Sequence, residues 1–92
     1  MFTYDLSDEL KQQLKLLFKK NKSLYSIILK KIEQIIMQDH ETINHYKNLR
    51  YDLSDCKRVH IDKSFVLLFK IYLDKNFILF YKFDHHDNVY KN

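Results

Sequence analysis

Two adjacent histidines, His85 and His86, follow the apolar stretch of the segment FYKFDHHDNVYKN at residues 80–92. A third, His60, ends the run CKRVH at residues 56–60. Because the unperturbed pKa of imidazole lies near neutrality, these side chains are candidates for proton transfer, for metal binding, or simply for a solvated surface. The choice among these three roles depends on which histidines the fold brings together.

A metal site would combine Cys56 with His60, His85 and His86, which contain suitable sulfur and nitrogen ligands. Zinc sites take their ligands in pairs a few residues apart, usually on turns. Cys56 and His60 are four residues apart in an expected strand, which separates them by about 13 Å. The sequence therefore predicts no metal and no other cofactor, and a solvated rim remains the alternative role for the histidines.

Metal-free cleavage of RNA is the third chemistry that these residue types allow. It needs a base for the 2′-hydroxyl proton, an acid for the leaving 5′-oxygen, and cations near the phosphate. His60 and His86 are candidates for the proton transfers, and Arg58 and Lys82 for the cations. Tyr90 is a candidate for stacking on a base. This chemistry requires residues from separate segments to share one surface.

Three strands are expected to position these residues, at 56–62, 64–73 and 76–86, with a short hairpin connection at 74–76. Successive side chains of a strand point to opposite faces, so Arg58 and His60 share a face. In the last strand, strict alternation places two sets on opposite faces: Phe77, Leu79, Tyr81, Phe83 and His85, against Ile78, Phe80, Lys82, Asp84 and His86. With helices on the first set, the two histidines and two cations converge on the uncovered face.

The first half of the sequence predicts a short strand at 2–5 and two amphipathic helices. Ser7 is the expected N-cap of the first helix and Ser23 of the second. Their apolar stripes are Leu10, Leu14, Leu17 and Phe18, and then Leu24, Ile27, Ile28, Ile32, Ile35 and Ile36. A link of a few residues makes the helices an antiparallel hairpin. The polar segment 39–55 is expected to be a loop anchored by Leu49.

Composition limits the possible functions of this single domain, residues 1–92. The absence of glycine and proline excludes Gly-rich phosphate loops. One cysteine fits a reducing cytosol, and the sequence shows neither a secretion signal nor a membrane span, so we expect a cytoplasmic protein. Residues 47–92 hold nine Lys and Arg against six Asp and Glu, and this basic half is rich in Tyr and Phe. A basic and aromatic half of this kind favours an anionic partner, and nucleic acid is the first candidate.

The order of strand, helix hairpin, loop and three strands resembles the RelE/ParE superfamily of toxins from bacterial and archaeal toxin–antitoxin pairs. The motifs are most similar to its YafQ-like and RelE-like mRNA interferases. LRYDLSDCKRVHI at 49–61 resembles the family's leucine-to-histidine segment, and FVLLFKI at 65–71 its central strand. FDHHDNVYK at 83–91 is similar to its C-terminal stretch. Nearly the whole chain is covered by the resemblance.

The resemblance implies an α+β fold, β-α-α-β-β-β, with an antiparallel sheet and an N-terminal helix hairpin on one face. It implies a metal-independent endoribonuclease that cleaves mRNA at the ribosome and is neutralised by a cognate antitoxin. His60, His86 and Tyr90 match catalytic positions. Lys47 falls where YafQ-like members have another catalytic histidine, with His45 as a second candidate by proximity. The expected substrate-binding residues are Lys47, Arg50, Arg58, Lys82 and His85.

Three positions depart from the family pattern. Val66 stands where many RelE relatives have arginine, Ser64 where YafQ-like members have an active-site aspartate, and Asp84 where a glycine is usual. The departures at Ser64 and Val66 favour one alternative, a non-catalytic protein that binds an antitoxin. A DNA gyrase inhibitor of the ParE branch is another alternative, although the pair His60 and His86 argues against it.

Overall fold

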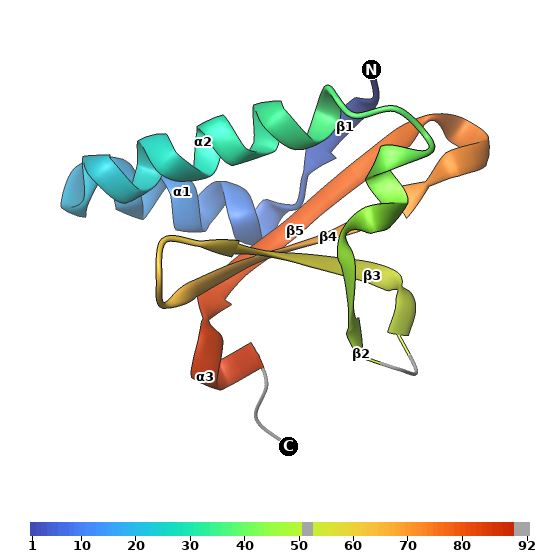
Figure 1. The fold of residues 1–92 in the computed structure, drawn as a ribbon. Helices are drawn as coiled ribbons and strands as arrows, with labels where there is room; N and C mark the ends of the chain where they lie inside the picture. Colours follow the sequence, from blue (N-terminus) through green and yellow to red (C-terminus); the bar gives the residue numbers. More distant parts are fainter. Residues whose placement is uncertain (51–52, 90–92) are drawn as a thin grey trace.

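The computed structural model describes residues 1–50 and 53–89, of which 44, 45, 47–50 and 53–55 are described by their backbone only. The fold is α+β, as predicted, with a helix hairpin on one side of a sheet (Figure 1). Within the described ranges, no helix has the length and apolar character needed to span a membrane. The elements are β1 (Thr3–Leu6), α1 (Asp8–Lys20), α2 (Lys22–Ile36), η1 (Thr42–His45), β2 (Lys47–Arg50), β3 (Leu53–Ile61), β4 (Phe65–Tyr72), η2 (Leu73–Lys75), β5 (Phe77–His85) and α3 (His86–Val89).

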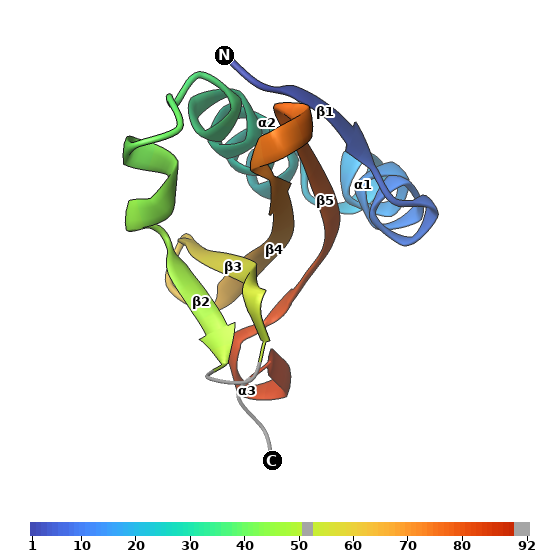
Figure 2. The same cartoon turned by 90° about the vertical axis from the view of Figure 1, so that its right-hand side faces the viewer.

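The sheet has the strand order β1-β5-β4-β3-β2 (Figure 2) and is mixed rather than antiparallel throughout. β1 runs parallel to β5, with Thr3 opposite Phe77 and Leu6 opposite Phe80. The other neighbours are antiparallel. The expectation of a purely antiparallel sheet is therefore wrong at this edge. A parallel pair needs a long connection, which the helix hairpin and the remaining strands supply here.

Two side-chain caps fix where the helices of the hairpin begin, and one apolar face packs the hairpin on the sheet. Oγ of Ser7 accepts a hydrogen bond from the Leu10 amide, as predicted for an N-cap. Asn21, not Ser23, caps α2, because its side chain accepts from the Leu24 amide while its own N–H donates to the Leu17 carbonyl. One residue thus closes α1 and opens α2. The buried face of the hairpin covers the sheet with Leu10, Leu14, Leu24, Ile28, Ile32 and Ile35.

Segment 39–55 is more ordered than the expected loop. It contains the 3-10 turn η1 and strand β2, and its fully buried anchor is Ile43, whereas the side chain of the predicted anchor Leu49 is not described. A carboxylate oxygen of Asp39 accepts from the Thr42 amide and hydroxyl, and these hydrogen bonds lower the pKa of Asp39. Tyr46 packs edge-on against a core ring, and burial raises its pKa. Strand β2, in this segment, therefore belongs to the sheet: it pairs antiparallel with β3 at the edge opposite β1.

A β-bulge in β5 changes which side chains face the helices. Leu68 pairs with Lys82 and Phe69 with Phe80, so that Tyr81 is the extra residue of β5. Ile78, Phe80 and Phe83 consequently lie in the helix-side core, and Tyr81 packs with Val66 and Leu68 on the opposite face. Strict alternation wrongly placed Ile78 and Phe80 with Lys82 and Asp84, because a bulge reverses the alternation beyond it.

Helix α1 holds the outer edge of β5 at this bulge. The Ser7 amide donates to the Phe80 carbonyl at 2.9 Å, and the Ser7 hydroxyl donates to the Tyr81 carbonyl at 2.5 Å. The side-chain amide of Gln13 donates to the Phe83 carbonyl at 2.7 Å and accepts from the Phe83 amide at 3.0 Å. The N-cap Ser7 and the side chain of Gln13 therefore supply hydrogen bonds to β5 where β1 has ended.

Removal of the Gln13 amide is expected to destabilise the fold at the bulge. Gln13→Leu keeps the side-chain volume but leaves two part-buried backbone groups of Phe83 without these partners, which costs about 2 kcal/mol. Urea denaturation should show this decrease in the free energy of unfolding. Gln12→Leu, at an exposed position of the same helix, should change it by less than about 0.5 kcal/mol. Equal stabilities of the two variants would contradict the role of Gln13.

Candidate functional site

The face of the sheet opposite the helix hairpin carries two rows of paired residues from β3, β4 and β5. In one row His60 pairs with Val66, and Val66 with Asp84. In the next row Arg58 pairs with Leu68, and Leu68 with Lys82. Residues paired in register share a face of the sheet. Polar groups thus flank an apolar centre of Val66 and Leu68, onto which the side chains of Val89 and Tyr81 pack.

His86 also lies on this face, but its position does not follow from strand alternation because it is not part of a strand. It begins α3 rather than continuing β5, and its amide donates to the carbonyl of Ser64 at 2.6 Å. Ser64 belongs to the turn that joins β3 to β4, next to His60. The rings of His60 and His86 are stacked, with centroids 5.4 Å apart and an interplanar angle of 28°. Two histidines 26 residues apart in the sequence therefore lie side by side on the face of the sheet opposite the helix hairpin.

Asp84 turns the chain from β5 into α3. Its carboxylate accepts from the His85 amide at 2.7 Å and from the side-chain amide of Asn88 at 3.0 Å. A glycine at this position could form neither bond. Asp84 and the Ser64 carbonyl together hold the first turn of α3, and both positions are among the three departures from the family pattern. The backbone of Ser64, and not its side chain, is the part that contacts His86.

His85 points away from the paired histidines. Its ring packs edge-on against Phe65, with centroids 5.6 Å apart, on the helix side of the sheet. Its Nδ1 accepts a hydrogen bond from the Asp87 amide at 3.2 Å, which requires a lone pair on that nitrogen. The structure therefore does not bring His85 together with His60 and His86, and its expected substrate-binding role stays a prediction.

The cations of the site come from three strands. Arg58 and Lys82 are half-buried, and Lys70 lies with its ammonium group 6.0 Å from the centre of the Tyr81 ring. Lys70 is not among the cations expected from the sequence, although alternation along β4 puts it on the same face as Val66 and Leu68. Lys57 pairs with Phe69 and so belongs to the helix side.

Three further candidates cannot be placed as side chains. The backbone of Lys47 pairs with that of Arg58, which puts Lys47 in the same row as the cations, and Arg50 pairs with Leu53. The side chains of Lys47 and Arg50 are not described, and Tyr90 lies outside the described residues. The described part of the chain contains no group of three or more His, Cys, Asp or Glu side chains that could hold a metal ion.

The fold is shared with solved structures of small toxins. A metal-bound toxin from Helicobacter pylori superposes with a TM-score of 0.74, at 20% identity, over 98% of this chain and 100% of that one. YafQ from E. coli gives a TM-score of 0.63 at 12% identity, over 98% and 99% of the two chains. Identities this low support the fold alone. No protein-family model matches the sequence.

Two relatives have a higher sequence identity to this chain than these solved structures do. A protein of Methanocaldococcus jannaschii named "Putative toxin RelE4" is 46% identical over 91 residues, which cover 99% of this chain and 93% of that protein. An uncharacterized protein of Methanosarcina mazei is 39% identical over 90 residues. The chain belongs to the RelE family, the toxins of toxin–antitoxin systems. This membership implies a cognate antitoxin as a partner.

Proposed function

We propose that this toxin is a metal-independent endoribonuclease that cleaves mRNA at the ribosome and so inhibits translation in the cytoplasm. The observation that carries the proposal is the stacked pair His60 and His86 on the face of the sheet opposite the helix hairpin. Their spacing lets both rings reach the two reacting oxygens of one phosphodiester. One imidazole takes the 2′-hydroxyl proton and the other protonates the 5′-oxygen.

The positive charges support the same chemistry. Lys82 lies in the same row as Arg58 but two strands away, about 10 Å across the sheet, and Arg58 itself lies one row from His60, a displacement of about 7 Å along β3. That distance suits contacts with the scissile phosphate or with its neighbours in a bound strand. A cation near the phosphate stabilises the negative charge that develops in the transition state. Lys47 and Arg50, at the edge strand, extend the proposed RNA path.

Two residues have supporting roles in the proposal. Tyr90 follows α3 directly in the sequence and orients a base or the phosphate, by stacking or by hydrogen bonding. His85 keeps its proposed contact with substrate only if RNA passes around the end of β5, because its ring packs on the other side. We therefore expect His85 to contribute least among the proposed residues.

The decisive experiment combines the purified toxin with ribosomes translating a defined mRNA and maps the new RNA ends by primer extension. We expect cleavage within the codon in the ribosomal A site, and equal cleavage by toxin that was first treated with excess EDTA and then desalted, because the ribosomes themselves need Mg²⁺. The EDTA comparison matters because one structural neighbour is described as metal-bound. Intact mRNA with wild-type toxin would refute the nuclease, and cleavage that EDTA abolishes would refute its metal independence.

A further inference from the structure

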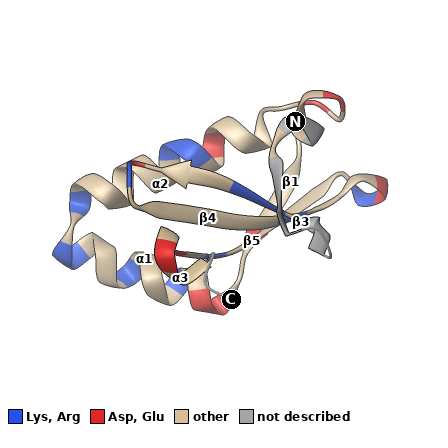
Figure 3. Ribbon diagram, turned by 60° about the horizontal axis from the view of Figure 1, so that its bottom comes forward, with Lys and Arg blue, Asp and Glu red and all other residues tan. Residues whose placement is uncertain are grey.

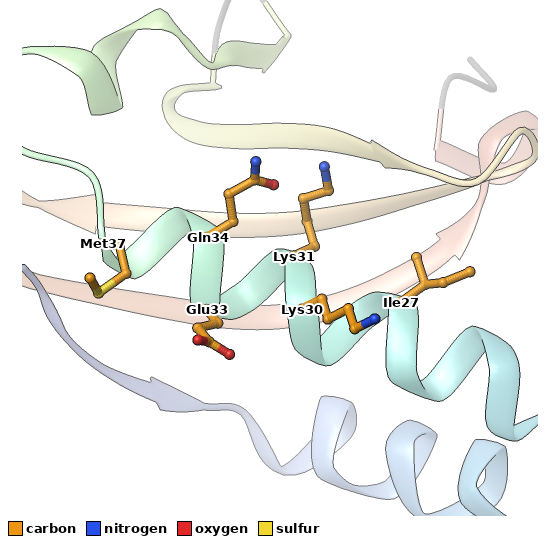
Figure 4. Close-up of a pocket in the computed structure, with 6 residues that line it drawn as sticks. All are labelled: Ile27, Lys30, Lys31, Glu33, Gln34 and Met37. Atoms are coloured by element: carbon orange, nitrogen blue, oxygen red, sulfur yellow. The ribbon is translucent and has the colours of Figure 1, made fainter.

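A groove runs along the outer side of α2, the side that the helix does not bury on the sheet. It encloses about 680 Å³, and it has an apolar side chain at each end and polar side chains between them. We call it the α2 groove. Its residues are Ile27, Lys30, Lys31, Glu33, Gln34 and Met37 (Figure 4). Because the groove lies on the helix side of the sheet, a partner bound in it leaves the His60 and His86 face uncovered.

The lining of the α2 groove is symmetric about the level of Ile32, a buried residue at the middle of its length. Equal numbers of positions separate Ile32 from three pairs of lining residues: Ile27 and Met37, Lys30 and Gln34, and Lys31 and Glu33. Met37 follows the last residue of α2, but its φ of −81° and ψ of −7° extend the helical spacing to it. A two-fold axis at the level of Ile32 therefore brings two such grooves together with their helices antiparallel.

The charged residues of the groove are complementary under this symmetry. Figure 4 shows Lys30 and Glu33 on one side of α2. The two-fold axis puts like sides of the two helices together and reverses their direction. At a rise of 1.5 Å per residue, Lys30 lies about 3 Å before the level of Ile32, and Glu33 of the second copy lies about 1.5 Å before it. Each Lys30 ammonium group therefore meets a Glu33 carboxylate, and the pair occurs twice.

The other side and the two ends of the groove follow the same rule. Lys31 and Gln34 point to the side opposite Glu33 in Figure 4, and the symmetry brings Lys31 level with Gln34 of the second copy. Ile27 is 37% exposed and Met37 is 62% exposed. Both are five positions from Ile32, so each Ile27 packs on Met37 of the second copy. These two contacts remove from water the apolar side chains that the single chain exposes.

The charge of α2 favours a copy of itself over a partner of one charge sign. Figure 3 shows basic and acidic positions side by side on α2, whereas α1 beyond its first turn carries basic positions only. In the described part of the chain, neither Lys30 nor Glu33 is in an ion pair. An acidic partner would be repelled by Glu33, and a basic partner by the two lysines. The basic face of α1 would likewise repel its own copy.

We propose that the chain forms a two-fold symmetric dimer through the α2 grooves of two copies. The contact involves one helix of each subunit, so it is small and the dimer dissociates on dilution. Exposed ion pairs contribute little affinity each, so the apolar contacts at the ends stabilise the dimer and the Lys30 and Glu33 pairs fix its register. The inference rests neither on the proposed nuclease nor on the family.

Sedimentation equilibrium over about 5–500 µM chain tests the proposal by measuring the dissociation constant of the dimer. Lys30→Glu and Glu33→Lys should each raise this constant at least tenfold, because each variant puts like charges together in both pairs. An equimolar mixture of the two variants should dimerise within about threefold of the wild type, because every pair again joins opposite charges. Lys20→Glu, the same charge change at an exposed position of α1, should stay within about twofold. Circular dichroism checks that each variant is folded.

Three results would overturn the proposal. One is a wild-type chain that stays monomeric at the highest concentration, which would leave the α2 groove to a different partner. Another is a dimer that both charge variants leave unchanged, which would place the interface elsewhere. The third is a mixture that dimerises no better than its two components, which would exclude the pairing of Lys30 with Glu33. Because no RNA is present, the outcome does not depend on the nuclease proposal.

Discussion

His86→Ala is expected to reduce mRNA cleavage by a factor of about 10²–10⁴, the usual loss when a general acid or base is removed. The side chain makes the ring contact with His60, whereas the amide of the same residue makes the hydrogen bond to Ser64. Alanine removes the first and retains the second, so the chain should fold as before. Primer extension on ribosome-bound mRNA measures the loss, and urea denaturation checks the fold.

His85→Ala is the matched control for this variant. It changes the neighbouring histidine, which packs on Phe65 on the other side of the sheet, and we expect cleavage within a few-fold of the wild type. His60→Ala should resemble His86→Ala, and the double variant should be little worse than either single one, because a base and an acid act as a unit. Wild-type cleavage by a folded His86→Ala protein would rule out the proposed role.

Phe80→Ala is expected to destabilise the protein more than any other single change discussed. The ring is fully buried between the sheet and the helices, 5.6 Å from the Phe69 ring and 6.1 Å from the Tyr4 ring. Truncation of a buried phenylalanine costs about 3–5 kcal/mol. A domain of this size has a total stability of about 5–10 kcal/mol. Urea denaturation should therefore show a midpoint reduced by about a third or more.

An exposed apolar residue on the helix hairpin is the control. Leu16 is 57% exposed, and Leu16→Ala should change the free energy of unfolding by less than about 0.5 kcal/mol. A small effect of Phe80→Ala would show that the β5 bulge is misplaced, because strict alternation would put this ring on the opposite face. The comparison therefore also tests the register of β5.

The helices and the central strand could be predicted because their signals are local. The stripe that includes Leu10 and Leu14 repeats at helical spacing, and the Ser7 cap bonds only three residues away. The apolar run of β4 fits a strand covered on both faces. In β3, alternation correctly put Arg58 and His60 on one face, since no bulge interrupts its pairing with β4. These features need no knowledge of distant segments.

Features that depend on distant hydrogen bonds could not be predicted in this way. The bulge at Tyr81 is held by Ser7 and Gln13, about 70 residues earlier in the chain. The parallel partner of β1 and the strand β2 likewise depend on which edges of the sheet remain free. A single sequence carries no local signal for such pairings, since each is selected by the packing of the whole domain.

The sequence by itself determined the residue types of the site and the face of β3 on which two of them lie. His86 shares that face with His60 and His85 does not, as alternation predicted; only the tertiary structure decided that the rings of His60 and His86 stack. Strand alternation assigned these two adjacent histidines to opposite faces, but the actual placement of His86 comes from a backbone hydrogen bond to Ser64 and from the turn at Asp84. Contacts between segments, rather than the periodicity within one, bring the two rings together.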